Sequence, residues 1–248
     1  MFPNYKRTNP PLWLERNFWF RKAYILRRLL HHSGGRYSSD SDRFIKRIFK
    51  HLQDQGLVSK SGFFVDVGCY HPVRGNTTYV LYRRGWQGIN IDVDSIKIEA
   101  FNLRRPRDTN ITCAVSKEPG EMKYWRKGLW SIYNSLEHKE ASKAEGFREM
   151  VVKVDTLTNL IDATPHKDHQ IDFLSVDVEG HDLEVLQSLD FVRYCPKVIC
   201  IETWESNLSD VMRSQLYSFM MDKGYALVNW VSSNLVFLHQ DYPHIQYP

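Results

Sequence analysis

Acidic side chains stand at the ends of four short apolar runs in this 248-residue sequence. Asp66 lies in the run 63–67, and Asp92, Asp177 and Glu202 end the runs 88–92, 171–177 and 197–202. In an open parallel sheet, ligands bind outside the carboxyl ends of the strands, where the strand order reverses. We therefore expect these carboxylates to surround one crevice. Such a crevice repels phosphate and attracts cationic or hydroxyl-bearing ligands.

The first of these runs lacks the glycine fingerprint of a dinucleotide site. Gly68 is followed by no further glycine until Gly75, so the G-x-G-x-x-G pattern that cradles pyrophosphate is absent. S-adenosylmethionine (SAM) carries an ammonium, a sulfonium and a ribose with two free hydroxyls, but no phosphate. We predict SAM as the ligand, with Asp66 near its amino-acid end and Gly68 allowing a close backbone approach.

The neighbouring runs complete this predicted cofactor site. Asp92 stands 26 residues after Asp66, a position suited to the ribose hydroxyls. Ala114 and Val115 end a further apolar run, 111–115, and could form the adenine floor. Each signal alone is weak, because an aspartate at a strand end is commonly a helix cap. The joint pattern, D-x-G at the first strand and an acidic residue at the end of the second, is more specific for a SAM site than either signal alone.

The elements that would position these residues alternate between strand and helix. Helix-length segments at 77–84, 95–103 and 183–189 separate the five apolar runs, which predicts right-handed crossovers and a mostly parallel α/β sheet. Residues 225–231 and 235–239 predict a C-terminal antiparallel hairpin. Residues 121–125 and 150–154 read as two further strands around a polar insertion at 126–149.

Several ordered motifs resemble the FkbM family of SAM-dependent methyltransferases. They are DVGCYHP at 66–72, NTT at 76–78, LY at 81–82, GW at 85–86, GINID at 88–92, VDTL at 154–157 and DVEGHDLEVL at 177–186. The resemblance covers roughly residues 37–204. It implies a Rossmann-like class I methyltransferase fold with a mostly parallel seven-stranded sheet, SAM as methyl donor, and usually methylation of an oxygen.

The same resemblance extends to site residues and to the acceptor. It places Asp66, Gly68, Cys69, Asn76 and Asp92 at or near the cofactor. Cys69 departs from the family, where alanine is more usual. The variant with His-Pro after the glycine motif is similar to members associated with bacterial surface glycans, whose acceptors are sugar hydroxyls.

Two candidates for a catalytic base follow from the fourth run. His181 comes four residues after Asp177, and its neutral imidazole can accept a hydroxyl proton near pH 7. Asp177 could itself be the base or orient the acceptor. Alternatively, His181 is an early helix residue that packs locally. Asp177, Glu179, Asp182 and Glu202 could also hold Mg²⁺, but they equally suit helix caps and arginine pairs, so we assign no metal site.

The chain divides into a basic amphipathic helical extension at 1–36 and a methyltransferase domain at 37–248. On a helix, Trp19, Ala23, Leu26 and Leu30 share one face. Two interpretations stay open: the helix docks on its own domain or on a second subunit in a homo-oligomer, or it rests on an anionic membrane surface.

The insertion offers an acceptor platform, with Trp125, Trp130 and Tyr133 to stack on sugars and Arg126, Lys127 and Lys139 to meet acidic groups. The alternative is a solvated lid.

Composition and charge bear on the binding partners and on the cellular location of the protein. A net charge of +4 and the absence of a basic groove signature argue against nucleic acid as a partner. Four cysteines without a C-x-x-C pair, and no apolar run near 20 residues, predict a cytoplasmic protein, free in the cytoplasm or at the inner membrane surface.

We expect an enzyme that methylates a sugar hydroxyl on a glycan or glycolipid precursor, as in polysaccharide biosynthesis. The alternatives are methylation of a small secondary metabolite, or a catalytically inactive SAM-fold subunit that serves assembly or membrane tethering.

Overall fold

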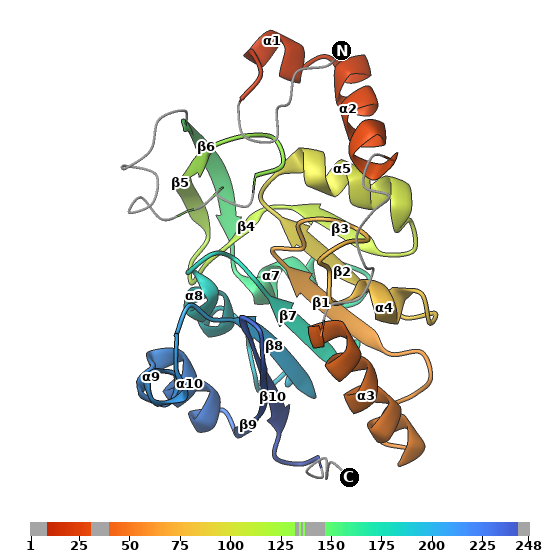
Figure 1. The fold of residues 1–248 in the computed structure, drawn as a ribbon, viewed down its shortest axis with the longest axis vertical. Coiled ribbons are helices and arrows are strands. Elements are labelled where there is room, and N and C mark those ends of the chain that lie inside the picture. Colours follow the sequence, from red (N-terminus) through yellow and green to blue (C-terminus); the bar gives the residue numbers. More distant parts are fainter. Residues whose placement is uncertain (1–8, 31–39, 132–133, 135, 137–146, 243–248) are drawn as a thin grey trace.

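A central sheet of seven strands organises the protein (Figure 1). The computed structural model describes residues 9–30, 40–131, 134, 136 and 147–242. Along the sheet the strands are β3 (Thr109–Thr112), β2 (Gln87–Asp92), β1 (Phe63–Val67), β7 (Phe173–Val176), β8 (Val198–Glu202), β10 (Asn234–His239) and β9 (Tyr225–Val231). The first five are mutually parallel, whereas β10 runs antiparallel to both β8 and β9. The predicted fold and its C-terminal hairpin are confirmed.

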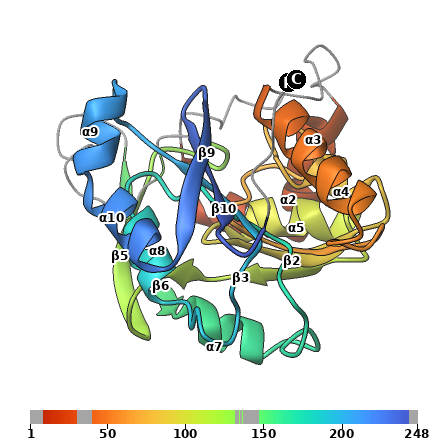
Figure 2. The same cartoon turned by 90° about the horizontal axis from the view of Figure 1, so that it is seen from below.

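Helices cover both faces of this sheet, which explains the near-continuous apolar runs of its parallel strands. Phe63, Val65 and Val67 of β1 pack in one cluster with α7 (Leu157–Asp162), α8 (Asp182–Gln187) and α10 (Gln215–Asp222). Phe64 points to the other face and packs under α3 (Asp40–Asp54) and α4 (Tyr79–Tyr82). Figure 2 shows α3 and α4 on one side of the strands and α7 on the other. Alternation along β1 therefore decides which side chains meet which helices.

The run predicted as one strand at 111–115 is divided in the structure. Thr112 ends the edge strand β3, and the chain then crosses to a second, three-stranded sheet of order β4-β6-β5. Its strands are β4 (Ala114–Val115), β6 (Arg148–Asp155) and β5 (Gly120–Arg126). β5 and β6 are the strands predicted around the insertion, and they pair antiparallel. The division follows from pairing, because Ala114 finds its partner in Val154 rather than in the main sheet.

The N-terminal segment forms two helices where the sequence suggested one. α1 (Leu12–Glu15) ends before Asn17, whose side chain accepts a hydrogen bond from the backbone N–H of Phe20 at 3.0 Å and so caps α2 (Phe18–Leu30). α2 packs on α5 (Ser95–Arg104), through a cluster that includes Tyr24 and Trp130. The remaining residues of the expected extension, 1–8 and 31–36, lie outside the described part of the chain. Near the C-terminus, α9 (Leu208–Arg213) directly precedes α10 in the chain.

Candidate functional site

A crevice of about 400 Å³ opens at the carboxyl ends of the parallel strands. This volume lies within the range of small-molecule sites. Residues from β1, β2, β4, β5, β7 and β8 and the loops that follow them form its walls. The predicted site residues that line it are Gly68, Asp92, Ala114, Val115 and Asp177.

Asp92 is held in place by three donors. Its Oδ1 accepts a hydrogen bond from the backbone N–H of Asp94 at 2.9 Å, and its Oδ2 accepts from the N–H of Tyr70 at 3.1 Å. The Nζ of Lys97 lies 3.2 Å from the same Oδ2. A carboxylate has about four lone-pair sites, so this geometry leaves capacity for a ligand hydroxyl.

Lys97 is a site residue that sequence reasoning missed. It is buried, and it is the one lysine, arginine or histidine among the described residues lining the crevice. Burial is the largest single effect and would lower the pKa of Lys97, but Asp92, Tyr124 and Asp94 together raise that pKa above its ordinary value. Its position five residues after Asp92, in the first turn of α5, is the signal that could have revealed it.

Gly68 lies where the chain leaves β1 in a sharp turn. Its φ is +78°, and a Cβ atom at this position would lie 1.7 Å from the carbonyl oxygen of Asp177. The backbone N–H of Gly68 donates to the carbonyl of Ile91 at 2.9 Å, while that of Asp177 donates to Val67 at 3.0 Å. The turn is thus clamped between β2 and β7. Only glycine allows this approach without a shift of the backbone.

Asp66, Asn76 and Cys69 do not line the crevice, and their expected place at or near the cofactor stays a prediction. Asn76 Nδ2 and Thr78 Oγ1 donate to Asp66 Oδ2 at 2.7 and 2.9 Å. Arg105, fully buried, donates to Asn76 Oδ1 at 2.8 Å. Burial raises the pKa of Asp66 and the Arg105 charge opposes this rise. Asp66 shares the face of Phe64 on β1 and therefore points beneath the turn, and this network supports the loop that follows it.

Part of the crevice lining is apolar. Ile91, Cys113, Ala114 and Val115 form a surface at the position predicted for adenine. Tyr124 of β5 also lines it. Within the described part of the chain, its buried hydroxyl has no hydrogen-bond partner. A buried polar group without a partner is costly, so this hydroxyl is suited to meet a ligand atom.

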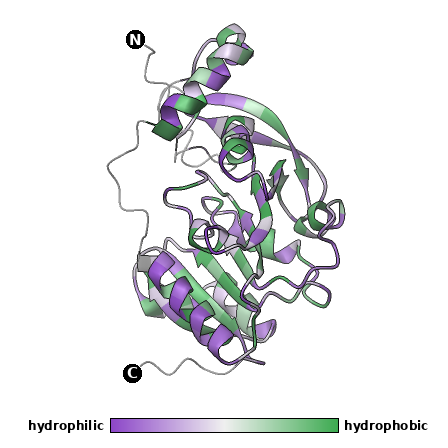
Figure 3. Ribbon diagram, turned by 90° about the vertical axis from the view of Figure 1, so that its right-hand side faces the viewer, coloured by the Kyte–Doolittle hydropathy of each residue, from purple (hydrophilic) through white to green (hydrophobic). Residues whose placement is uncertain are grey.

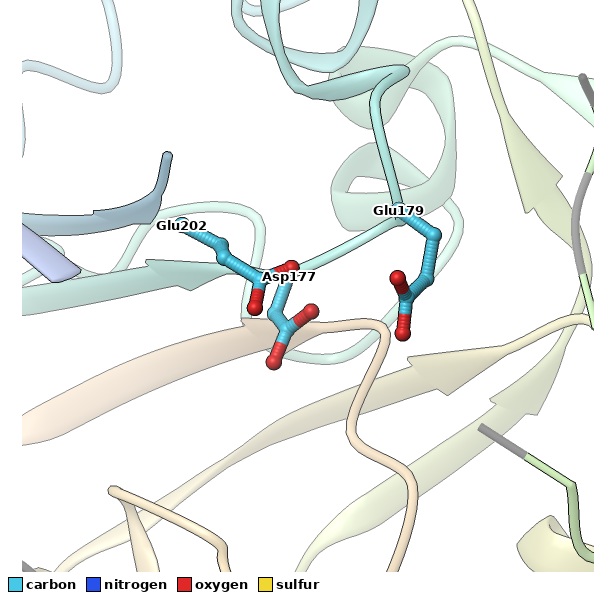
Figure 4. A group of neighbouring side chains, drawn as sticks. All are labelled: Asp177, Glu179 and Glu202. Carbon is cyan, nitrogen blue, oxygen red and sulfur yellow. The ribbon is translucent and has the colours of Figure 1, made fainter. Parts of the chain in front are cut away.

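Three carboxylates gather at the other end of the crevice. Asp177, Glu179 and Glu202 bring ligand oxygens within 4.8 Å of one another, and Figure 4 shows Glu202 and Asp177 side by side with Glu179 beside them. The carboxyl groups of Asp177 and Glu202 are close enough that the charge of Glu202 disfavours ionisation of Asp177.

Burial and like charge raise the pKa values of this carboxylate cluster. Burial among surrounding protein atoms, followed by the charge of the adjacent Glu202, raises the pKa of Asp177 well above its ordinary value. Part of the Asp177 side chain is nevertheless exposed at the crevice. Burial, followed by Asp177, raises the pKa of Glu179 to about 7, with Lys97 opposing. Glu179 can therefore bind or release a proton near neutral pH at the crevice, beside a second carboxyl group, Asp177, whose pKa is also raised.

His181 lies away from the crevice lining. It is the N-cap residue of α8, with its Nε2 2.9 Å from the hydroxyl of Ser116 and its Nδ1 3.8 Å from Glu184. Asp182 accepts hydrogen bonds from the N–H groups of Val178 and Gly180 at 3.1 and 3.2 Å and so shapes the loop. The structure thus brings Asp177 to the site but not His181, whose local packing was the alternative interpretation.

The platform predicted from the insertion is mostly not available to an acceptor. Trp130 is fully buried under α2, and Arg126 is buried in a bidentate pair with Glu15 at 2.7 and 2.6 Å. Tyr133 and Lys139 lie outside the described residues. A different aromatic, Trp204, lines the crevice after β8 and is 72% exposed.

The chemistry of these walls fits SAM. An apolar floor suits adenine, Asp92 suits ribose hydroxyls, and the carboxylates suit the cationic tail, whereas a phosphate would meet mainly negative charge. The strand order is that of a Rossmann-like fold, and the acidic crevice is of the kind that suits a SAM-dependent methyltransferase.

The sequence matches the methyltransferase FkbM domain over residues 66–227, and the chain belongs to the FkbM methyltransferase family. The predicted family is confirmed, and membership supports SAM as the methyl donor.

Solved structures of similar fold include further methyltransferases. A TehB-like SAM-dependent methyltransferase from Corynebacterium glutamicum is 13% identical, with a TM-score of 0.45, over 90% of this chain and 100% of the other. Magnesium protoporphyrin IX methyltransferase from Synechocystis, with bound SAM, is 10% identical with a TM-score of 0.42, over 88% and 91% of the two chains. No protein of curated function matches the sequence.

Among the described residues, none of the helices is both long enough and apolar enough to span a bilayer.

Proposed function

We propose that this methyltransferase transfers the methyl group of SAM to a hydroxyl oxygen of a sugar, on a glycan or glycolipid precursor. The observation that carries the proposal is the carboxylate cluster of Asp177, Glu179 and Glu202 in the crevice. A sugar hydroxyl is a poor nucleophile near pH 7, so methylation at oxygen benefits from a group that takes its proton. Carboxylates with raised pKa values are suited to this task.

The reaction is a balanced displacement. When bound, SAM supplies a methyl group on a sulfonium leaving group. The acceptor oxygen forms a bond to the methyl carbon as the carbon–sulfur bond breaks, and the electron pair of that bond stays on sulfur as a thioether. The hydroxyl proton passes to a carboxylate of the cluster. We assign Asp177 and its neighbour Glu202 this role, because they stand together in the crevice lining and the pKa values of both are raised, which makes them stronger bases than ordinary carboxylates.

The acceptor class rests on two further observations. Carboxylates orient hydroxyls by accepting their hydrogen bonds, and the exposed indole of Trp204 at the crevice wall gives a flat apolar surface for a sugar face. The His71-Pro72 variant of the glycine motif points the same way through its resemblance to glycan-modifying members.

A methyl-transfer assay with labelled SAM tests this proposal. Sugar hydroxyl acceptors, free and lipid-linked, are compared with amine analogues of the same sugars. We expect transfer to hydroxyls, with kcat lowered about 10²- to 10⁴-fold by Asp177→Asn or Glu202→Gln. Glu184→Gln, on α8 outside the crevice lining, serves as the matched control and keeps kcat. Preferred transfer to the amines, or full activity of both carboxamide variants, would contradict the proposal.

A further inference from the structure

The outer surface of the two N-terminal helices is unusually apolar. Trp13 is 73% exposed, Trp19 77% and Leu30 72%, although large apolar side chains normally gather inside. In Figure 3 green apolar and purple polar residues alternate along these helices, at the top of the molecule. We call this surface the N-terminal patch, formed by Leu12, Trp13, Phe18, Trp19, Leu26 and Leu30.

The patch is distinct from the face by which α2 docks on the protein. Phe20, Tyr24 and Ile25 of α2 are buried against α5 and Trp130. Trp19, Leu26 and Leu30 fall on the opposite side at helical spacing and remain exposed. The predicted apolar face is therefore the outward one, and the helix carries a second apolar face that the sequence analysis did not separate.

Ion pairs fix the patch to the rest of the molecule. Glu15 of α1 pairs with Arg126 and with Arg148, the latter at 3.0 Å. Arg21 of α2 pairs with Glu99 of α5 and donates to Ser95 at 3.0 Å. A partner that binds the patch thus meets a preformed surface and pays little ordering entropy.

Positive charge accompanies these aromatic side chains. Residues 12–30 contain five arginines and lysines against one glutamate, which is itself paired inward. Arg16 is exposed, and Lys22 lies with its ammonium 5.5 Å from the ring centroid of Phe18, a residue of the patch. Tryptophan, leucine and basic residues on one helix face are the combination that enters the headgroup region of anionic membranes.

We propose that the N-terminal patch docks the protein on an anionic lipid bilayer. The charges argue against a second copy of the chain as the occupant. A symmetric dimer places the same surface of both copies face to face, so two surfaces that both carry the positive charges of Arg16 and Lys22 would meet. Lipid phosphates neutralise these cations while the indoles enter the interface. The proposal does not depend on which acceptor is methylated.

Co-sedimentation of the full chain with lipid vesicles tests this docking. Vesicles of phosphatidylcholine alone are compared with vesicles that also contain phosphatidylglycerol, at about 0.15 M salt. We expect binding to the anionic vesicles only. The Trp13→Ser/Trp19→Ser variant should lose affinity about tenfold or more through lost apolar burial, and Arg16→Glu/Lys22→Glu should lose it through charge. Thermal unfolding and SAM binding check that both variants stay folded.

The basic helix α3 provides a matched control. Lys46 and Lys50 are exposed there, but the apolar residues of α3, including Ile45 and Phe49, are buried in the core. Lys46→Glu/Lys50→Glu should keep vesicle binding within about twofold, because α3 has no outward apolar face. Absent binding, or an equal loss in the α3 variant, would overturn the proposal. So would a dimer in sedimentation velocity that the double tryptophan variant dissolves.

Discussion

Substitution of Gly68 by alanine should disturb both the fold and the carboxylate cluster. The new Cβ would lie 1.7 Å from the carbonyl oxygen of Asp177, a backbone atom that cannot rotate away. The positive φ of +78° adds a cost of about 1–2 kcal/mol for a residue with a side chain. Forced movement of packed backbone costs roughly 1–3 kcal/mol more. We therefore expect the free energy of unfolding to fall by about 2–5 kcal/mol.

Gly75 supplies the control for this substitution. Its φ is also positive, at +54°, but no described atom lies within 4 Å of a Cβ built there. Gly75→Ala should cost only the conformational term, about 1–2 kcal/mol. Urea denaturation of both variants isolates the clash as the difference between them. Because the clash displaces the Asp177 backbone, Gly68→Ala should also lower kcat more than Gly75→Ala does. Equal destabilisation by the two variants would refute this reasoning about the turn.

Three further predictions concern buried charge. Arg105→Met should lower the free energy of unfolding by about 3–5 kcal/mol, since it leaves the Asp108 carboxylate buried and unpaired. Arg107 is exposed and provides the control: Arg107→Met should change the free energy of unfolding by no more than about 0.5 kcal/mol, and urea denaturation measures both values. Lys97→Met should move the acid limb of the pH–rate profile to higher pH, because Lys97 lowers the pKa of Asp177, the assigned proton acceptor; an unmoved limb would argue against this coupling. Asp94, whose pKa burial raises from 3.8 to about 6, binds more protons folded than unfolded. Its stabilising contribution is therefore complete below pH 3.8 and is lost as pH rises through about 6. Thermal unfolding at a series of pH values should show that the wild-type melting temperature falls over this range relative to that of Asp94→Asn.

The strands of the main sheet were predictable because they are buried on both faces. A strand of this kind needs apolar residues at nearly every position, and the runs at β1, β2, β7 and β8 are short and bounded. The break at Cys113 was not predictable in this way. It depends on the pairing of Ala114 with Val154, forty residues further along the chain, and no local signal marks it.

Some site residues could be predicted from their position at strand ends, whereas others depend on strand alternation and on the geometry of the loops. Asp92, Ala114 and Val115 reach the crevice as expected, since strand ends converge there. Asp66 does not, because it shares its face with Phe64, an alternation that the sequence contains but that strand-end position alone ignores.

His181 lies away from the crevice lining for a different reason. Glu179 and Gly180 have φ values of +57° and +94°, and this turn directs Glu179 to the crevice and His181 to Ser116. Proximity of His181 to Asp177 in sequence therefore did not become proximity to the reacting groups. Lys97 escaped prediction because its pairing with Asp92 depends on how α5 packs against β2.

Calorimetric titration with SAM tests the central claim most directly. Wild type is compared with Asp92→Asn/Lys97→Met, which removes both charges of the pair and so avoids an unpaired lysine in the crevice. Loss of hydrogen bonds from the ribose to a charged acceptor should cost about 1.5–3 kcal/mol, a weakening of tenfold or more. Binding by wild type that weakens in this way is the result the account predicts. Folded wild type that does not bind SAM, or a variant that binds it equally well, would contradict the assignment of this crevice.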